Sequence, residues 1–180
     1  SSYTFVPVDG DEVRLRMKAA ALNSRDLQVI ANQYDPNQRL PIVPVSDGAG
    51  EIIETGSDVT AFKPGERVSP CFAQGWVAGL RTWERWLTHV GGHYDGTLQE
   101  ECVLPAEGLV RVPEALSDVE AAACGVAAAT AWQALITEGK IFAGQTVLVQ
   151  GTGGVALFAL QFARMHGARV PVQVHRLARR

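Results

Sequence analysis

The residue types and spacing near the C-terminal end suit phosphate chemistry, in the run Gly151-Thr152-Gly153-Gly154-Val155-Ala156. This run fits the pattern G-x-G-x-x-G/A, with alanine in the third small position. The first glycine permits a tight turn, the second lets the main chain approach a diphosphate, and the third small residue lets helix and strand pack closely. Amides at the helix start would face the phosphates with the positive end of the helix dipole. The pattern predicts dinucleotide binding through Gly151, Thr152, Gly153, Gly154 and Val155; a tight structural turn is the alternative.

The acidic residue that usually completes this motif is missing. Its carboxylate would hold the ribose 2′-hydroxyl of NAD about 20 positions after the first glycine. Residues 139–180, however, carry six basic and no acidic side chains. Arginine and histidine would suit a 2′-phosphate, so the sequence favours NADP over NAD. Pro171 weakens the inference, because it falls where a second parallel strand is expected and cannot donate to the ladder.

Metal binding is not predicted. The chain contains neither HExxH nor CxxC, and its four histidines have no Cys or Glu at spacings typical of zinc ligands. His89 and His93 are four residues apart, but Gly91 and Gly92 between them argue against a helix that would align the two rings.

The elements that must position these residues differ between the two parts of the chain. From Val13 to Ala21 apolar and charged residues alternate, which predicts a half-buried strand. Further β-type runs, separated by turn signals such as Lys63-Pro64-Gly65-Glu66 and Tyr94-Asp95-Gly96-Thr97, occupy residues 51–54, 67–72, 99–104 and 109–112. Strands at this spacing predict a compact β-barrel or sandwich.

Helical signals begin at Ser117, which forms a capping box with Glu120. We expect Gly125 to break this helix and a second helix to follow over residues 127–137. A continuous apolar strand, residues 145–150, then leads through the glycines into a helix over residues 155–166, as in a β-α unit of a parallel sheet. The predicted domains are residues 1–125 and 126–180.

The composition is that of an ordinary globular protein, with 180 residues, 47% hydrophobic, 19% charged and a net charge of −3. Three widely separated cysteines argue against a disulfide framework and favour a reducing, cytoplasmic location. No apolar run approaches the ~20 residues of a membrane helix, so no membrane partner is expected. The basic end, residues 175–180, lacks interleaved aromatics and favours a solvated tail over nucleic-acid binding.

The sequence resembles the medium-chain dehydrogenase/reductase family, which includes zinc-type alcohol dehydrogenases and quinone oxidoreductases. As in that family, a β-rich part is followed by a capped Ala-rich helix pair and then by a nucleotide loop. The resemblance covers about residues 10–170. It is carried by Ala21-Leu22-Asn23-Ser24-Arg25-Asp26, Ser46-Asp47-Gly48-Ala49-Gly50-Glu51, Phe62-Lys63-Pro64-Gly65-Glu66-Arg67-Val68, Asp95-Gly96-Thr97-Leu98-Gln99-Glu100, Thr130-Ala131-Trp132 and the glycine loop. It implies a mixed β and α/β fold, in which a GroES-like barrel precedes the start of a Rossmann doubly wound domain.

The resemblance also implies site residues. Zinc-dependent relatives have ligands where this chain has Asn23, Ser46 and Val126, and they carry a four-Cys lobe that is absent here, so the resemblance implies a zinc-independent member. Asn23 and Asp26 would line the nicotinamide end of the cleft, with a turn or helix cap as the alternative. Thr130 would approach the nicotinamide ribose. Tyr34 and Trp76 would form an aromatic wall, with core packing as the alternative. Asn23 and Tyr34 are the candidates for polarising the substrate oxygen.

The chain departs from the family near its end, where the pattern is lost over residues 171–176 and most of the cofactor domain is absent. We therefore expect a C-terminally truncated or frameshifted form that binds NADPH poorly and has little activity, because a single β-α unit buries too little surface. Two functions compete: a nicotinamide-dependent oxidoreductase acting on a small alcohol, carbonyl, enone or quinone, homodimeric at full length, and a non-catalytic module for assembly or weak nucleotide binding.

Overall fold

The structure is a computed structural model that describes residues 7–35 and 37–174. The chain divides into two compact units at the Gly125–Val126 bond. We call residues 1–125 unit 1 and residues 126–180 unit 2, and each is described by itself. The basic tail expected at residues 175–180 lies outside the described residues.

Unit 1 is built on a five-stranded antiparallel sheet with the strand order β4-β1-β2-β3-β5. Its elements are β1 (Glu12–Ala21), α1 (Ser24–Ile30), β2 (Asp47–Thr55), β3 (Arg67–Pro70), α2 (Trp83–Trp86), β4 (Glu101–Pro105), η1 (Ala106–Gly108) and β5 (Leu109–Arg111). Each of the five predicted β segments overlaps a strand. The Lys63–Glu66 turn between β2 and β3 is also present, with Gly65 at φ +91°.

Strand β1 is an interior strand of the sheet, paired with β2 on one side and β4 on the other, and its apolar side chains meet those of both neighbours. Leu15 pairs with Ile52 of β2 and with Cys102 of β4, and all three side chains are buried in one core cluster. The alternation in β1 has one exception. Arg14 is also buried, and its Nε donates to the carboxylate of Glu54 at 2.8 Å, which compensates the burial of its charge.

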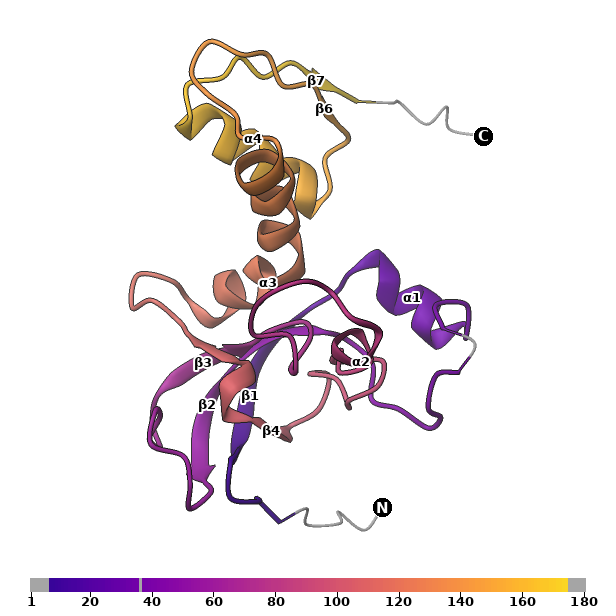
Figure 1. The fold of residues 1–180 in the computed structure, drawn as a ribbon, viewed down its shortest axis with the longest axis vertical. Helices are drawn as coiled ribbons and strands as arrows, with labels where there is room; N and C mark the ends of the chain where they lie inside the picture. The colour runs from indigo at the N-terminus through magenta and orange to yellow at the C-terminus, as the bar shows by residue number, and fades with distance from the viewer. Residues whose placement is uncertain (1–6, 36, 175–180) are drawn as a thin grey trace. The chain divides into compact units, whose positions relative to one another are not determined.

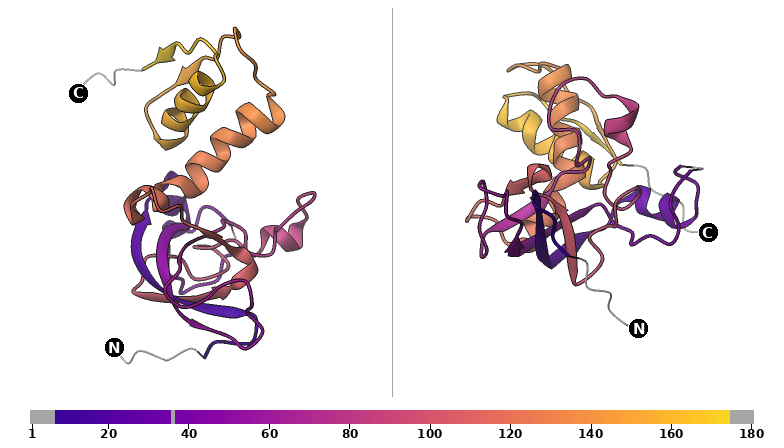
Figure 2. Two further views of the ribbon diagram at one scale, coloured as in Figure 1. Left: turned by 90° about the vertical axis from the view of Figure 1, so that its left-hand side faces the viewer. Right: turned by 60° about the horizontal axis from the view of Figure 1, so that its bottom comes forward.

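The sheet of unit 1 curls into an open barrel (Figures 1 and 2). Its two edge strands, β4 and β5, follow each other in the chain and are joined only by the single turn η1. Two main-chain hydrogen bonds fix this turn, from Ala106 N to Asp11 O and from Cys71 N to Gly108 O. The predicted mixed fold with a leading β-barrel is confirmed.

Helix α3 (Asp118–Trp132) begins with the predicted capping box but does not end where predicted. Ser117 Oγ accepts from Glu120 N at 3.3 Å, and the Glu120 carboxylate accepts from Ser117 N at 2.9 Å. The predicted break at Gly125 is wrong, since the helix passes through it and continues as the π-helical turn η2 (Gln133–Glu138). Gly125 serves close packing instead, because an added Cβ would lie 2.4 Å from Asp47 Oδ1.

Replacing Gly125 by alanine should therefore destabilise the protein by about 1–2 kcal/mol, although alanine is the better helix former. The added methyl group would displace a buried carboxylate that accepts from Asn23. Chemical denaturation measures the change. In an Asp47→Ala background the clash is gone and the same substitution should become stabilising; an unchanged sign in both backgrounds would contradict this explanation.

Unit 2 contains β6 (Val149–Gln150), α4 (Gly154–Met165) and β7 (Val172–Gln173), together with the end of α3 and η2. Strands β6 and β7 are parallel, with Val149 opposite Val172. Pro171, which cannot donate to the ladder, lies just before β7 and takes part in the pairing only as an acceptor, from Val149 N at 3.0 Å. Because Pro171 has no N–H, one hydrogen bond of the ladder is missing between the bridge at Thr146 and β6. The strand predicted over residues 145–150 is therefore regular only at its end.

Among the described residues, one helix is long and apolar enough, by length and composition, to cross a membrane: residues 118–138, with a mean hydropathy of 1.4. This corrects the expectation that no apolar run approaches that length. Core helices of soluble proteins meet the same criterion. The first turns of this helix pack Ala121 and Ala122 against Ala49 of the sheet, in a second cluster of buried residues in unit 1.

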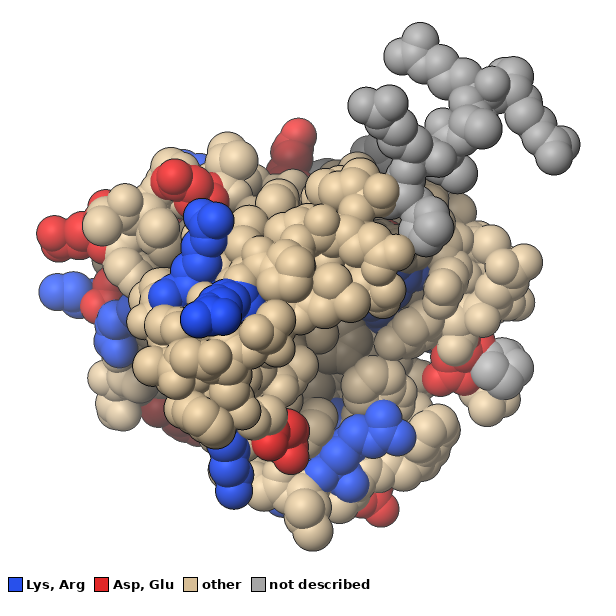
Figure 3. Space-filling view, turned by 90° about the horizontal axis from the view of Figure 1, so that it is seen from above, with Lys and Arg blue, Asp and Glu red and all other residues tan. Residues whose placement is uncertain are grey.

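Charged side chains are dispersed on the face drawn in Figure 3. Lysine and arginine groups there are separated by uncharged surface and interspersed with acidic groups. The described residues on this face form no continuous basic stripe of the kind that tracks a nucleic-acid backbone.

Candidate functional site

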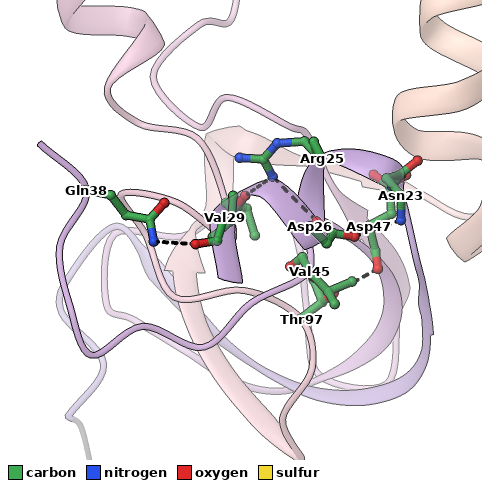
Figure 4. A network of polar contacts seen from close by, with 9 residues as sticks. Asn23, Arg25, Asp26, Val29, Gln38, Val45, Asp47 and Thr97 are labelled. Carbon is green, nitrogen blue, oxygen red and sulfur yellow. Dashed lines mark hydrogen bonds and ion pairs between the residues drawn. The ribbon is translucent and has the colours of Figure 1, made fainter. Parts of the chain in front are cut away.

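The predicted catalytic residues Asn23 and Asp26 meet at the start of α1 (Figure 4). Asn23 is the N-cap residue, and its main-chain N–H donates to Asp26 Oδ2 at 2.7 Å. Its side-chain Nδ2 donates to Asp47 Oδ2 at 2.9 Å. Both carboxylates are buried. The structure thus assigns the helix-cap role to this pair and joins it to the start of β2.

The Asp95-Gly96-Thr97 segment holds the start of β2 in place. Thr97 Oγ1 donates to the main-chain carbonyl of Asp47 at 2.7 Å, and Thr97 N donates to Val45 O at 2.8 Å. Gly96 N donates to Val43 O, and a Cβ at Gly96 would lie 2.3 Å from Val45 O. The motif is therefore a tight main-chain crossing that positions Asp47 toward Asn23.

Arg25, which the sequence reasoning did not select, connects this pair to Tyr34. Its guanidinium carbon lies 4.5 Å from the centre of the Tyr34 ring and 4.8 Å from that of Phe72. Its Nη1 donates to Val90 O at 3.2 Å and lies 3.8 Å from Asp26 Oδ1. The sequence signal that could have pointed to Arg25 is its place between the candidates Asn23 and Asp26, on one helical turn.

The two predicted aromatic residues do not form a wall together. Tyr34 is half-buried against Arg25 and against the edge of the His89 ring, with ring centres 5.8 Å apart. Trp76 is 36% exposed and donates its indole N–H to Gly79 O at 2.9 Å. Core packing, the alternative considered for Trp76, is therefore wrong. Among the described ring contacts, none joins Trp76 to Tyr34.

His89 lies at the centre of the aromatic group beside Tyr34. Its ring stacks on Phe72 with centres 5.5 Å apart, and it also meets Trp86 and the edge of His93. Nδ1 lies 2.8 Å from Trp86 O. Because a carbonyl oxygen only accepts, Nδ1 carries the proton and Nε2 of the neutral ring has a free lone pair. Burial lowers the pKa of His89, with smaller contributions of the same sign from Arg25 and His93.

This lowered pKa predicts that stability decreases as the pH falls below about 6.5, since the unfolded chain then binds a proton that the buried ring resists. The loss stops once the pH is below the pKa of the folded state. The hydrogen bond from the main-chain N–H of Asn37 lowers the pKa of Asp35, so protonation of that carboxylate affects stability only at more acidic pH. Denaturation between pH 5 and pH 7.5, roughly the range over which unperturbed histidine titrates, measures the slope. His89→Phe should flatten it, and an unchanged slope would assign the effect elsewhere.

A histidine–carboxylate pair borders the same group of rings. His93 Nε2 lies 3.2 Å from Asp35 Oδ2, and Asp35 Oδ1 accepts from Asn37 N at 2.8 Å. Asp35 directly follows Tyr34 in the chain. Nothing in the sequence indicates this pair, because the two residues are 58 positions apart and no local motif links them; His93 was considered only as a possible metal ligand with His89.

The glycine loop of unit 2 is open. Gly151 has φ +87°, and a Cβ added at Gly151 or Gly153 would meet no atom within 4 Å. Gly153 caps α4, and residues 151–155 are all exposed. A Cβ at Gly154 would lie 3.1 Å from Ala127 Cβ, so this glycine permits close packing on α3. Thr130 is exposed one turn further along that helix.

The described residues contain no group of three or more His, Cys, Asp or Glu side chains that could hold a metal ion. The cysteines are unpaired. Burial raises the pKa of all three thiols, that of Cys102 to about 12, which keeps them protonated. Cys102 is buried, whereas Cys71 and Cys124 are only half-buried.

Residues 9–114 match the family "Alcohol dehydrogenase GroES-like domain". The chain is 45% identical over 165 residues to the zinc-type alcohol dehydrogenase-like protein C1773.06c of Schizosaccharomyces pombe, covering 89% of this chain and 47% of the relative. It is 32% identical over 166 residues to an alcohol dehydrogenase of Geobacillus stearothermophilus, covering 88% and 49%.

A solved NAD-dependent alcohol dehydrogenase has a TM-score of 0.85 and 32% identity, with 96% of this chain and 52% of that chain covered. The chain thus spans about half the length of these relatives. The family match covers more than half of the chain, and the curved sheet and its turn residues fall within it. The chain belongs to the alcohol dehydrogenase GroES-like domain family, the N-terminal part of medium-chain dehydrogenases/reductases.

Proposed function

We propose that this chain is part of a nicotinamide-dependent oxidoreductase that exchanges hydride with a small alcohol or carbonyl compound, enones and quinones included. The open glycine loop at Gly151 and Gly153 carries the proposal, because only a loop without covering side chains leaves its amides accessible to a diphosphate. Relatives over 30% identical that are alcohol dehydrogenases support the reaction class.

The residues of the loop fit such a cofactor. The left-handed conformation of Gly151 turns the chain sharply after β6, and the open space at Gly153 lets the main chain approach phosphate oxygens. Val155 follows at the first turn of α4, where main-chain amides have no helical partner. When bound, the nicotinamide supplies the hydride chemistry. We assign Thr130 to its ribose. We propose NADP as the preferred cofactor, because residues 139–180 carry basic and no acidic side chains.

The remaining assignments concern unit 1. Asn23, Asp26 and Tyr34 form the substrate end, where polar donors act on the substrate oxygen. We propose a reaction without zinc, because Asn23 and Ser46 present an amide and a hydroxyl where the resemblance puts two of the zinc ligands, and the Asn23 amide is engaged by Asp47. Stoichiometric zinc in purified protein, with activity lost on chelation and restored by zinc, would contradict this assignment.

Three proposals complete the assignment. The partner is a small molecule rather than nucleic acid or membrane, the location is the cytoplasm, which fits the three unpaired thiols, and the full-length protein forms a homodimer. The competing function is a non-catalytic module. The small core of unit 2 favours it, with only Ala127, Ala131, Val149 and Ala163 as buried apolar residues among those described.

Titration of this chain with NADPH, followed by nicotinamide fluorescence, tests the proposal. We expect a weak but saturable enhancement below roughly 1 mM, because the loop is formed but the core of unit 2 is small. NADH in the same experiment serves as the comparison, and it should bind more weakly. No saturable signal with either nucleotide would favour the non-catalytic module.

A further inference from the structure

One loop of unit 1 presents large apolar side chains to solvent. We call residues 74–88, which include α2, the tryptophan loop. Figure 2 shows the loop around α2 projecting away from the sheet of unit 1. Every residue from 75 to 84 is exposed, and four of them are large apolar side chains with exposed fractions from 36% to 87%: Trp76, Val77, Leu80 and Trp83. Apolar side chains gathered on one projecting loop are typical of an interaction surface.

The base of the tryptophan loop is fixed to the barrel. Ala73 and His89, on either side of the loop, form an antiparallel bridge. Gln74 N donates to Thr88 O at 3.1 Å, and Gly75 N donates to Thr88 Oγ1 at 2.8 Å. The loop therefore leaves unit 1 and returns to it at adjacent, paired positions.

The tip of the loop is held by its own side chains. The indole N–H of Trp76 donates to Gly79 O at 2.9 Å. Arg85 Nη1 donates to Leu80 O at 2.7 Å, and Thr82 Oγ1 accepts from Arg85 N as the cap of α2. Because these contacts already order the main chain, a partner that binds here costs the loop little conformational entropy.

Two opposite charges lie beside the exposed apolar side chains. Arg81 and Glu84 are both exposed, and the Arg81 guanidinium carbon lies 4.8 Å from the centre of the Trp86 ring. Neither charge forms an ion pair with another residue that the structure describes. The tip thus offers one cation and one anion, both available to a partner.

This mixture of charges favours one kind of partner. An acidic peptide or an anionic lipid surface would meet Glu84 with like charge, and a basic partner would do the same to Arg81. A second tryptophan loop carries both signs. Across a two-fold axis, Arg81 of each copy faces Glu84 of the other, so both charges are paired by one arrangement.

We propose that the tryptophan loop is a self-association surface, which pairs with the same loop of a second copy of this chain. Trp83 and Leu80 form the apolar centre of the contact, and Arg81 and Glu84 form its polar rim. Tryptophan and arginine are the residue types most enriched in such contacts. The surface lies wholly within unit 1, and the proposal does not depend on nucleotide binding or on the proposed reaction.

Sedimentation velocity of the 180-residue chain over a range of concentrations, without nucleotide, tests the proposal. We expect a monomer–dimer equilibrium with a Kd of roughly 10–100 μM. Leu80→Ser should raise this Kd about tenfold or more, because the symmetry removes the side chain from both halves of the contact. Leu27→Ser is the matched control, since Leu27 is also highly exposed but lies on α1, outside the loop, and its replacement should leave the Kd unchanged.

Exchanging the charges identifies the two-fold pairing. Arg81→Glu alone and Glu84→Arg alone should each weaken self-association, because like charges then face each other across the axis. An equimolar mixture of these two variants should dimerise at least as well as the unaltered chain, since each copy supplies the charge that the other lacks. Circular dichroism verifies that each variant keeps the fold.

Three results would overturn the proposal. They are a chain that stays monomeric up to about 1 mM, a dimer whose Kd is unchanged by Leu80→Ser, and a mixture of the two charge variants that associates no better than either variant alone. The second result would place the dimer contact elsewhere on the chain. NADPH titration is a separate measurement, so either proposal can fail while the other stands.

Discussion

Replacing Gly96 by alanine should destabilise the protein by about 3 kcal/mol or more. The added Cβ would lie 2.2 Å from Pro44 O and 2.3 Å from Val45 O. Both contacts are with main-chain atoms, so no side chain can rotate away. The crossing that aligns Thr97 with Asp47 would have to open, and chemical denaturation would record the loss.

Gly65→Ala is the matched control for this substitution. Gly65 has φ +91° but no atom within 4 Å of an added Cβ, so alanine there introduces backbone strain without a clash. We expect a cost of roughly 1 kcal/mol. Equal losses at the two positions would mean that the close main-chain approach at Gly96 has no energetic weight.

Replacing Gly153 by valine should weaken NADPH binding tenfold or more while leaving the fold intact. The position has an ordinary φ of −76° and open space around it, so a side chain is accommodated without strain. That same side chain would occupy the space through which a diphosphate approaches the amides of α4. Nucleotide fluorescence measures affinity, and the circular dichroism spectrum monitors the fold.

Gly144→Ala provides the comparison within unit 2. It lies in a loop, at φ +90° with nothing within 4 Å of an added Cβ, and outside the nucleotide motif. It should cost some stability and leave NADPH affinity unchanged. If Gly153→Val bound NADPH as well as the unaltered chain, the loop would be a structural turn and its resemblance to a nucleotide site would be incidental.

The strands of unit 1 were predictable because their signals are local. Alternation in β1 and the turn residues between the strands each depend on a few neighbouring positions, and both are reproduced. Gly125 was misread because propensity treats glycine as a helix breaker, whereas its role depends on Asp47, which is distant in sequence. Pro171 cannot donate to the ladder, as expected, but it lies just before β7 and its carbonyl still accepts from Val149.

The site was predictable only in part. Asn23 and Asp26 were selected through the family resemblance, and the helix cap, which was the alternative, is the contact that the two residues make in the structure. Arg25, His89 and Gly92 come together only in the folded chain, and no sequence pattern encodes that proximity. The assignment of Tyr34, Thr130 and the glycine loop to catalysis or cofactor binding stays a prediction.

Helix α3 runs without interruption across the bond at which the contacts divide the chain. A fragment that ends at Gly125 would lack about half of this helix. The carbonyl groups of its last remaining turn would then lose the main-chain N–H groups that donate to them. Anyone wishing to produce the barrel by itself should therefore extend the fragment to Trp132 at least.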